Sequence, residues 1–312
     1  MCGWMLGCAQ LLEALVELMR RDVLASKVIQ SDDTTVPTLG LVKGRAKDAR
    51  LWCYVGDSDH RHAVFEYTTS REGKWPQRWL EGFKGYLQTD AFAGYGALTG
   101  GAGGATEVGC WAHARRGFHE SKALAPAFCL EVLREIARLY AIEAEAREAG
   151  MPHEARLALR AARSRARIEV VMSLLESQRS AHLPKSPVRQ AIEYVLTRRA
   201  AFEQYLTDGT IEIDNNACER CMRSPALGRK NWLFAGSAEG GKAIATWLTV
   251  IQSARLHDVE AFAYVSDLLT RLAEYRDLTA EQRASDREAT LRGLLPAQWL
   301  KANPHARLPL GR

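Results

Sequence analysis

Acidic residues at three separated positions are the side chains of this chain best suited to chemistry. Asp32 and Asp33 follow one short apolar run, Asp90 ends another, and Glu219 comes much later in the sequence. Converging carboxylates supply hard oxygen ligands for divalent cations, and two such ions can stabilise the attacking and leaving oxygens of a phosphodiester reaction. The pattern predicts a metal-dependent site that cuts or joins nucleic acid, with one acid of the Asp32-Asp33 pair, Asp90 and Glu219 as candidate ligands.

Each acidic position also has an ordinary structural interpretation. Neighbouring residues of a strand face opposite sides of the sheet, so only one of Asp32 and Asp33 can belong to a given metal site. Asp90 precedes small residues and also fits a turn that ends a strand. Asn216, followed three residues later by Glu219, has the spacing of a helix capping box. Each acid alone therefore leaves both interpretations open, whereas the three together favour a metal site.

Polar and basic residues around Glu219 suit contacts with phosphate. Asn215 and Asn216 stand at the start of a predicted helix, and Arg220 and Arg223 follow within it. The N-terminus of a helix attracts anions because its backbone N–H groups point outward. We interpret the two asparagines, together with Asp33, as supporting residues and the two arginines as DNA contacts.

A histidine and two arginines stand where a fifth strand would end. In the segment Cys110–Arg116, His113 could orient a water molecule or contact the scissile phosphate, and Arg115 and Arg116 could bind the DNA backbone. The alternative is a partly buried histidine beside two surface arginines.

Three other patterns each keep two interpretations. Cys110-x-x-His113 and Cys218-x-x-Cys221 resemble halves of a zinc site, but they lie much further apart than the ligands of compact structural zinc sites. The segment Gly228–Gly241 lacks a nucleotide-binding glycine pattern, and its basic and aromatic residues suit either nucleic acid or a structural hairpin. For the latter segment we predict DNA contacts at Arg229 and Lys230, and the hairpin alternative places Trp232 and Phe234 in the core. One predicted helix is strongly basic because it contains Arg156, Arg160, Arg163, Arg165 and Arg167. These arginines form either a solvated helix face or a surface that contacts phosphate.

The predicted elements place these residues on an α/β core. Helical spacing predicts a first helix over residues 9–26 and a short one over Trp75–Phe83. Five strands are predicted, at Lys27–Ser31, Leu51–Val55, Ala63–Thr69, Gly85–Thr89 and Glu107–Trp111. Three antiparallel strands and then two more, with carboxylates on the first and fourth, indicate a ribonuclease H-like mixed five-stranded sheet.

An all-helical insertion is expected to interrupt this core, because apolar residues recur at helical spacing in the middle of the chain. The chain then returns near Ile211 to deliver Glu219 on a helix. A flexible loop is predicted at Thr99–Thr106 and a last long helix at Ala261–Tyr275. The predicted divisions are an N-terminal helix (1–26), a first part of the core (27–119), the insertion (120–205), a second part of the core (206–257) and a helical tail (258–312).

The composition is that of a soluble globular protein, with 312 residues, 47% hydrophobic and 25% charged. The formal net charge of +5 suits nucleic acid without requiring it. Seven scattered cysteines without a signal peptide indicate free thiols in a reducing compartment. No apolar run is long enough to cross a bilayer, so we expect a cytoplasmic protein with no membrane partner.

At these residues the chain resembles a transposase of the insertion-sequence-66 family. The matching segments run in the family's order over about residues 10–275, at Asp32–Pro37, Gly85–Tyr95, Cys110–Arg116, Asp214–Arg220 and Gly228–Ser237. The resemblance implies a ribonuclease H-like DDE domain whose catalytic carboxylates fall on Asp32, Asp90 and Glu219. It also implies two Mg²⁺ or Mn²⁺ ions, cleavage at element ends and strand transfer into double-stranded target DNA. A homo-oligomer on DNA and accessory proteins of the same element are the further partners it suggests.

The chain departs from the family in three places, one of them at Cys218 and Cys221, where the family has small or apolar residues. Full-length members carry a coiled coil, a zinc-binding module and a helix-turn-helix that do not precede Trp4 here, and the first motif reads Asp32-Asp33-Thr34-Thr35 in place of Asp-Glu-Thr-Pro. Two alternatives therefore accompany the transposase hypothesis. One is a ribonuclease H-like nuclease or resolvase without strand transfer, and the other is a truncated or decayed, inactive remnant that binds DNA.

Overall fold

The chain folds into two compact units that share the strands of a mixed sheet. A computed structural model describes residues 2–99, 104–277 and 287–309. The first unit comprises Met1–Phe83 and Ala217–Arg312, and the second comprises Lys84–Asn216. Of the five strands, β1 to β3 are antiparallel in the first unit, whereas β4 and β5 are parallel in the second. The predicted ribonuclease H-like α/β class is confirmed.

The sheet of the first unit is built on a long hairpin. Its strands lie in the order β3-β2-β1, with β1 at Val28–Val42, β2 at Arg45–Val55 and β3 at Ala63–Thr68. Gly44 connects β1 to β2 with a φ of +76°, a conformation that glycine adopts without strain. Pairing with β2 continues β1 well beyond the predicted strand, so Asp32 and Asp33 lie inside a strand and not at its end.

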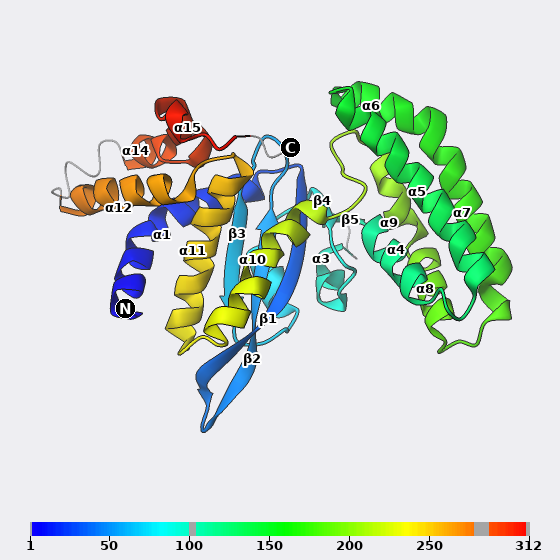
Figure 1. Ribbon diagram of the computed structural model, residues 1–312, viewed down its shortest axis with the longest axis horizontal. Coiled ribbons are helices and arrows are strands. Elements are labelled where there is room, and N and C mark those ends of the chain that lie inside the picture. Colours follow the sequence, from blue (N-terminus) through cyan, green and yellow to red (C-terminus); the bar gives the residue numbers. More distant parts are fainter. Residues whose placement is uncertain (1, 100–103, 278–286, 310–312) are drawn as a thin grey trace. The chain divides into compact units, whose positions relative to one another are not determined.

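Helices pack on both faces of this sheet. On one face lie α10 (Asn216–Trp232) and α11 (Ala238–Leu256), as Figure 1 shows. Their side chains form a hydrophobic core with the sheet, in which Cys221 and Met222 contact the cluster around Cys53 and Phe65. On the other face, Trp79 of α2 (Lys74–Trp79) stacks on Tyr54, with ring centroids 3.7 Å apart.

The remaining helices of the first unit surround α11. The N-terminal helix α1 (Cys2–Leu24) packs against α11 and starts earlier than predicted. The predicted helix at Ala261–Tyr275 is confirmed as α12 (Ala261–Asp277). Short elements complete this unit, namely α14 (Arg287–Gly293), α15 (Pro296–Ala302) and the 3-10 turn η5 (Pro304–Ala306). Among the helices described, none combines the length and apolarity needed to cross a membrane.

The second unit begins with two short parallel strands. After β4 (Tyr86–Gln88) come η1 (Ala93–Tyr95) and α3 (Gly96–Thr99), and then β5 (Thr106–Val108). The centre of the predicted loop at Thr99–Thr106 lies outside the described residues. The fifth strand ends earlier than predicted, because α4 (Trp111–Glu120) starts immediately after Cys110.

The predicted all-helical insertion makes up the rest of the second unit and is confirmed. Its longest helices, α5 and α7, pack along one another (Figure 1). The elements are α5 (Pro126–Glu148), α6 (His153–Leu159), the π-helical turn η2 (Arg160–Ser164), α7 (Arg165–Gln178), η3 (Arg179–Ala181), α8 (Pro187–Leu196), α9 (Arg199–Glu203) and η4 (Gln204–Leu206).

The arginine-rich helix is largely an internal ion-pair network. Arg160 is fully buried and donates to Glu143 at 2.7 and 2.8 Å. It also donates to the carbonyls of Tyr205, Asp208 and Ile211. Arg156 joins Glu143 to Glu212, each at 2.6 Å. Because these two guanidinium groups are occupied inside the unit, the interpretation of the helix as a phosphate-contacting surface is wrong for them.

Candidate active site

Asp32 lies on the face of the sheet that α10 covers. In the register of the hairpin it stands directly opposite Cys53, and Cys53 stands opposite Phe65. Residues directly opposite one another on paired strands share a face. Cys53 and Phe65 belong to the core formed with α10, so Asp32 shares that side. The half-buried Asp32 carboxylate accepts the backbone N–H of Asp33 at 2.7 Å.

Asp33 faces the opposite side and is held in ion pairs. It stands opposite Trp52, and its side chain is only 2% exposed. Arg50 and Arg71 approach its carboxylate at 3.1 and 2.8 Å. Two guanidinium groups neutralise this carboxylate, so Asp33 has a structural role in the sheet.

Glu219 lies in the first turn of α10, directly after Cys218, which packs between this helix and the strands of the sheet. The Cys218 N–H donates to Gln30 of β1 at 3.2 Å, and its thiol contacts the carbonyl of Cys53 at 3.4 Å. Burial, together with the negative charges of Asp32 and Glu219, raises the pKa of Cys218 to about 11. Asp32 on β1 and Glu219 on α10 thus share one electrostatic neighbourhood around Cys218 within the first unit.

Cys218 and Cys221 are core residues. Both pack with Cys53 in the core beneath α10, and the six cysteines whose side chains are described are free thiols. Cys218 is fully buried, and its thiol donates to the carbonyl of Cys53 at 3.4 Å. The zinc-like spacing is therefore explained for this half of the pattern by packing.

Asp90 directly follows β4 in the second unit. Its carboxylate accepts the N–H of Phe92 at 3.0 Å, and the preceding Thr89 hydroxyl accepts that of Ala91 at 3.1 Å. Ala91 has a φ of +65°, a conformation that costs energy for a residue with a β-carbon. The predicted turn chemistry at Asp90 is present, and it holds the carboxylate half-exposed at the carboxyl end of a parallel strand.

The segment leading into α10 is anchored to the second unit at successive residues. Gln88 at the end of β4 donates to the carbonyl of Glu212 at 2.9 Å, and the N–H of Trp111 donates to Ile213 at 3.2 Å. The Tyr140 hydroxyl donates to Asp214 at 2.7 Å, and the Cys110 thiol to Asn215 at 3.1 Å. Together these bonds fix the start of the helix that carries Glu219.

The predicted capping box at Asn216 and Glu219 is wrong. Because α10 already begins at Asn216, Glu219 is the fourth helical residue and not the third. Asp214 makes the capping contacts instead, accepting the backbone and side-chain N–H groups of Asn216 at 3.0 and 2.7 Å. This removes the main structural explanation for an acid at position 219.

The predicted basic contacts fall into two groups. Arg115 and Arg116 are exposed on α4, two and three residues after the half-buried His113, and Arg115 lies 5.3 Å from the ring centre of Tyr140. On α10, Arg220, Arg223 and Lys230 are also exposed. Arg229 differs from these because its guanidinium donates to the carbonyl of Thr35 in β1.

The segment after Arg229 is not a hairpin. It continues α10 to Trp232, which packs against the core, whereas Phe234 is 44% exposed. Ala235 then exchanges backbone hydrogen bonds with Pro37 and Leu39 of β1. The hairpin alternative places both Trp232 and Phe234 in the core. It is right that Trp232 packs against the core and wrong for Phe234.

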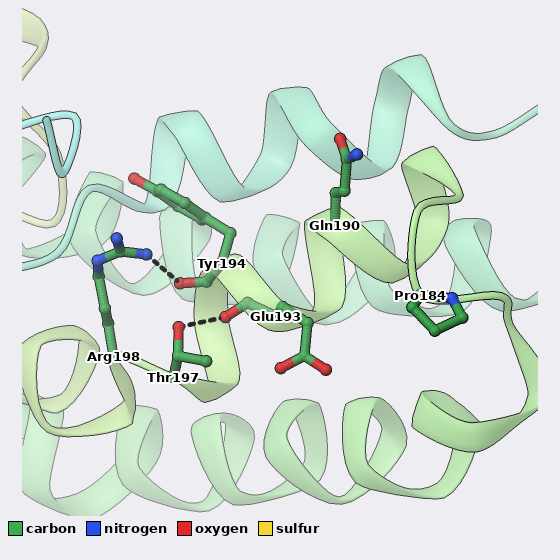
Figure 2. A pocket seen from close by; sticks show the side chains of 6 residues that line it. All are labelled: Pro184, Gln190, Glu193, Tyr194, Thr197 and Arg198. Atoms are coloured by element: carbon green, nitrogen blue, oxygen red, sulfur yellow. Dashed lines mark hydrogen bonds between the residues drawn. The ribbon is translucent and has the colours of Figure 1, made fainter. Parts of the chain in front are cut away.

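A cavity of about 340 Å³ lies on α8 in the helical insertion (Figure 2). Glu193 in its lining is ion-paired with Arg179 and Arg189, at 2.9 and 2.6 Å. Tyr194 in the same lining has a pKa well above its usual value, because of burial and the nearby charges of Cys110 and Asp90. The cavity is explained by the packing of the insertion, and we assign it no chemistry.

Gln88 and Tyr140 are the positioning residues that the sequence did not indicate. Each contacts the segment before α10 across a long stretch of chain. Gln88 lies within the matching segment Gly85–Tyr95, but its partner is a backbone carbonyl that any residue would provide.

Comparisons with known proteins give one family. The sequence profile described as Transposase IS66 family matches residues 1–243. Uncharacterized protein y4hP of Sinorhizobium fredii (strain NBRC 101917 / NGR234) is 32% identical, over 92% of this chain and 53% of its own length. Uncharacterized protein y4qI of the same organism is 33% identical, over 88% of this chain and 53% of its own length. This chain spans about half the length of the curated relatives that it matches.

Proposed function

Because this chain belongs to the IS66 transposase family, we propose that it is the catalytic part of a DNA transposase. It would cleave phosphodiester bonds at the ends of a mobile element and join those ends to target DNA. The observation that carries this proposal is that Asp32 stands opposite Cys53, whose carbonyl accepts the thiol of Cys218 next to Glu219, while Asp33 is turned away into two ion pairs. This difference favours Asp32 over Asp33 as a metal ligand, and we assign the third carboxylate to Asp90.

The donor set fits magnesium or manganese. Asp32, Asp90 and Glu219 offer carboxylate oxygens, the ligands that these hard cations prefer, and all three side chains are half-exposed. When bound, two such ions activate the attacking oxygen and stabilise the charge on the leaving oxygen.

The charge of the three carboxylates would couple metal binding to DNA binding in the proposed site. Three negative charges compensate only part of the four positive charges of two divalent ions, and a DNA phosphate would compensate the rest. Binding of metal and binding of DNA would therefore reinforce one another. Asp214 and the bonds around it keep the first turn of α10 in place, so that Glu219 is held before the substrate arrives.

The exposed cations give the DNA a surface to bind. We assign phosphate contacts to Arg115 and Arg116 on α4 and to Arg220, Arg223 and Lys230 on α10, with Arg229 holding the end of α10 to β1. His113 in the first turn of α4, with Asn215 and Asn216, would support the reacting phosphate or water. A homo-oligomer on DNA and accessory proteins of the same element remain part of the proposal.

The test is cleavage and joining with DNA taken from the flanks of the gene. Purified chain is incubated with flanking duplexes and a target plasmid, with Mg²⁺, with Mn²⁺ or with a chelator. We expect metal-dependent nicks at the element ends and joined products with the plasmid. Glu219→Gln should abolish both, whereas Glu239→Gln, a carboxylate in the first turn of α11, should leave both intact.

Each other outcome has a defined meaning. Cleavage without joining, also when pre-cut ends are supplied, would indicate a ribonuclease H-like nuclease or resolvase. DNA binding without cleavage in any metal would indicate an inactive remnant. Full activity of Glu219→Gln would refute the assignment of the carboxylates.

A further inference from the structure

A second polar cavity lies within the first unit, away from the α10 face of the sheet. Its volume is about 530 Å³, within the range of small-ligand sites. It is lined by the end of α1, the loop between β2 and β3, the end of α11, α14 and the start of α15. Its titratable lining residues are Asp22, Asp59, Arg61, His62, His257 and Arg292.

Two histidines in this lining each have a buried ring nitrogen without a partner among the described residues. His62 is only 5% exposed, and its Nδ1 accepts and donates no hydrogen bond there. The same is true of Nε2 of His257. Leaving a buried polar atom unsatisfied costs about 1–3 kcal/mol, so two of them in one cavity call for a ligand.

The other side of each ring is already oriented. Nε2 of His62 lies 3.7 Å from the carboxylate of Asp22, and Asp22 is also approached by Arg292 at 3.5 Å. His257 ends α11, and the backbone of Arg61 forms a hydrogen bond with it. Histidines that bind metals almost always have their second nitrogen held in this way by a carboxylate or a backbone carbonyl.

The spacing and the charge state suit a shared metal ion. The two ring centroids are 5.8 Å apart. Two imidazoles bound to one tetrahedral ion, at about 2.0–2.1 Å from each nitrogen, would place their centroids roughly 5 Å apart. Burial, together with the nearby His62 and Arg61, lowers the pKa of His257 to about 4, so this ring is neutral at neutral pH and can donate a lone pair.

We propose that His62 and His257 bind one divalent transition metal ion of the zinc or cobalt class, with Asp22 orienting His62. Imidazole nitrogens suit such borderline ions, whereas Mg²⁺ prefers oxygen ligands. Water from the cavity would complete the remaining coordination positions. The ion would tie the β2–β3 loop to the end of α11. This site is independent of the proposed transposase carboxylates.

The test is Co²⁺ binding to the full chain in buffer that already contains excess Mg²⁺. After treatment with a chelator and dialysis, the chain is titrated with Co²⁺ while visible absorption and the thermal midpoint are recorded. We expect one Co²⁺ per chain with a raised midpoint. Affinity should fall more than tenfold in His62→Gln and in His257→Gln, and 10- to 100-fold in Asp22→Asn.

Matched variants separate this site from others. His60→Gln changes a histidine of the same loop that is paired with Asp57 at 2.9 Å, and it should bind Co²⁺ as the wild type does. Glu219→Gln should also keep the Co²⁺ site, so loss of transposase chemistry and loss of this site are distinguishable. Circular dichroism checks that each variant is folded, and His257→Gln alone decides the matter if His62→Gln is not.

Two results would overturn the proposal. One is unchanged Co²⁺ binding in a folded His257→Gln variant, which would mean that water satisfies the two nitrogens. The other is a wild-type titration that does not show Co²⁺ at histidines. Either no Co²⁺ binds, or the bound Co²⁺ shows the intense near-ultraviolet absorption of thiolate ligands, which would assign the ion to cysteines.

Discussion

Asparagine substitutions at Asp32 and Asp33 should separate stability from metal response. The two residues are adjacent in β1, but the structure gives them different surroundings. Asp33 is buried between Arg50 and Arg71, whereas Asp32 lies on the face of the sheet that α10, the helix carrying Glu219, covers. We expect Asp33→Asn to destabilise the fold and Asp32→Asn to remove the response to metal.

The magnitudes follow from burial. Removing one partner of a buried ion pair costs about 3–5 kcal/mol. The side chains of Arg50 and Arg71 are 25% and 39% exposed, so water can partly solvate them after the change. We therefore expect Asp33→Asn to lower the free energy of unfolding by about 2–3 kcal/mol.

Asp32→Asn should be nearly neutral for stability without metal. Asparagine keeps an oxygen that can accept the N–H of Asp33, and the change removes a negative charge near Glu219. The expected change is within about 1 kcal/mol. The metal response is different, because a ligand present at one hundred times its dissociation constant stabilises a protein by about 2.7 kcal/mol. Wild type and Asp33→Asn should gain this stabilisation, and Asp32→Asn should lose most of it.

The assay is urea unfolding of the three chains, with Mn²⁺ or with a chelator. The difference between the two conditions gives the metal response, and the chelator series gives the stability. Equal metal responses in both variants would refute the assignment of Asp32 to the metal face. A stable Asp33→Asn with a lost metal response would reverse the two roles.

Three further predictions concern other parts of the chain. Burial raises the pKa of Glu66 to about 7 against the opposing charges of Arg20 and Arg78. The folded state therefore holds this proton more tightly than the unfolded state, so stability should fall as pH rises from about 4.5 to about 7. In Glu66→Gln the free energy of unfolding should fall by about 3 kcal/mol less than in the wild type over this pH range. The measurement is the free energy of unfolding of both proteins at pH 5 and at pH 8, and parallel pH profiles of the two proteins would contradict the prediction. Arg160→Met should lower the free energy of unfolding, measured in urea, by about 3–5 kcal/mol, because Glu143 loses a buried partner and backbone carbonyls lose a donor. A loss below about 1 kcal/mol would show that the fold does not depend on this ion-pair network. Arg220→Ala and Arg223→Ala should each lower the slope of log affinity for DNA against log salt concentration by about 1, whereas Arg163→Ala, paired with Glu145, should leave it unchanged.

Local patterns were sufficient for the elements but not for their ends. Apolar spacing predicted the helical insertion and the five strands, because burial on one face imposes a period on the sequence. The ends of β1 and β5 were misplaced. β1 continues because a distant part of the chain, β2, pairs with it, and β5 stops because α4 begins at Trp111.

The sequence by itself determined which acids were candidates, since carboxylates at Asp32, Asp33, Asp90 and Glu219 limit the available chemistry. Because side chains alternate along a strand, the sequence predicts that Asp32 and Asp33 face opposite sides of the sheet, but it does not predict which side a helix covers. That was decided when α10 packed on the Cys53 face and two arginines on the other. Likewise, arginines in a basic helix have the same local pattern whether they meet phosphate or a buried glutamate. Only tertiary packing brought Glu143 to Arg160, because the energy of a charge depends on its partners and its burial.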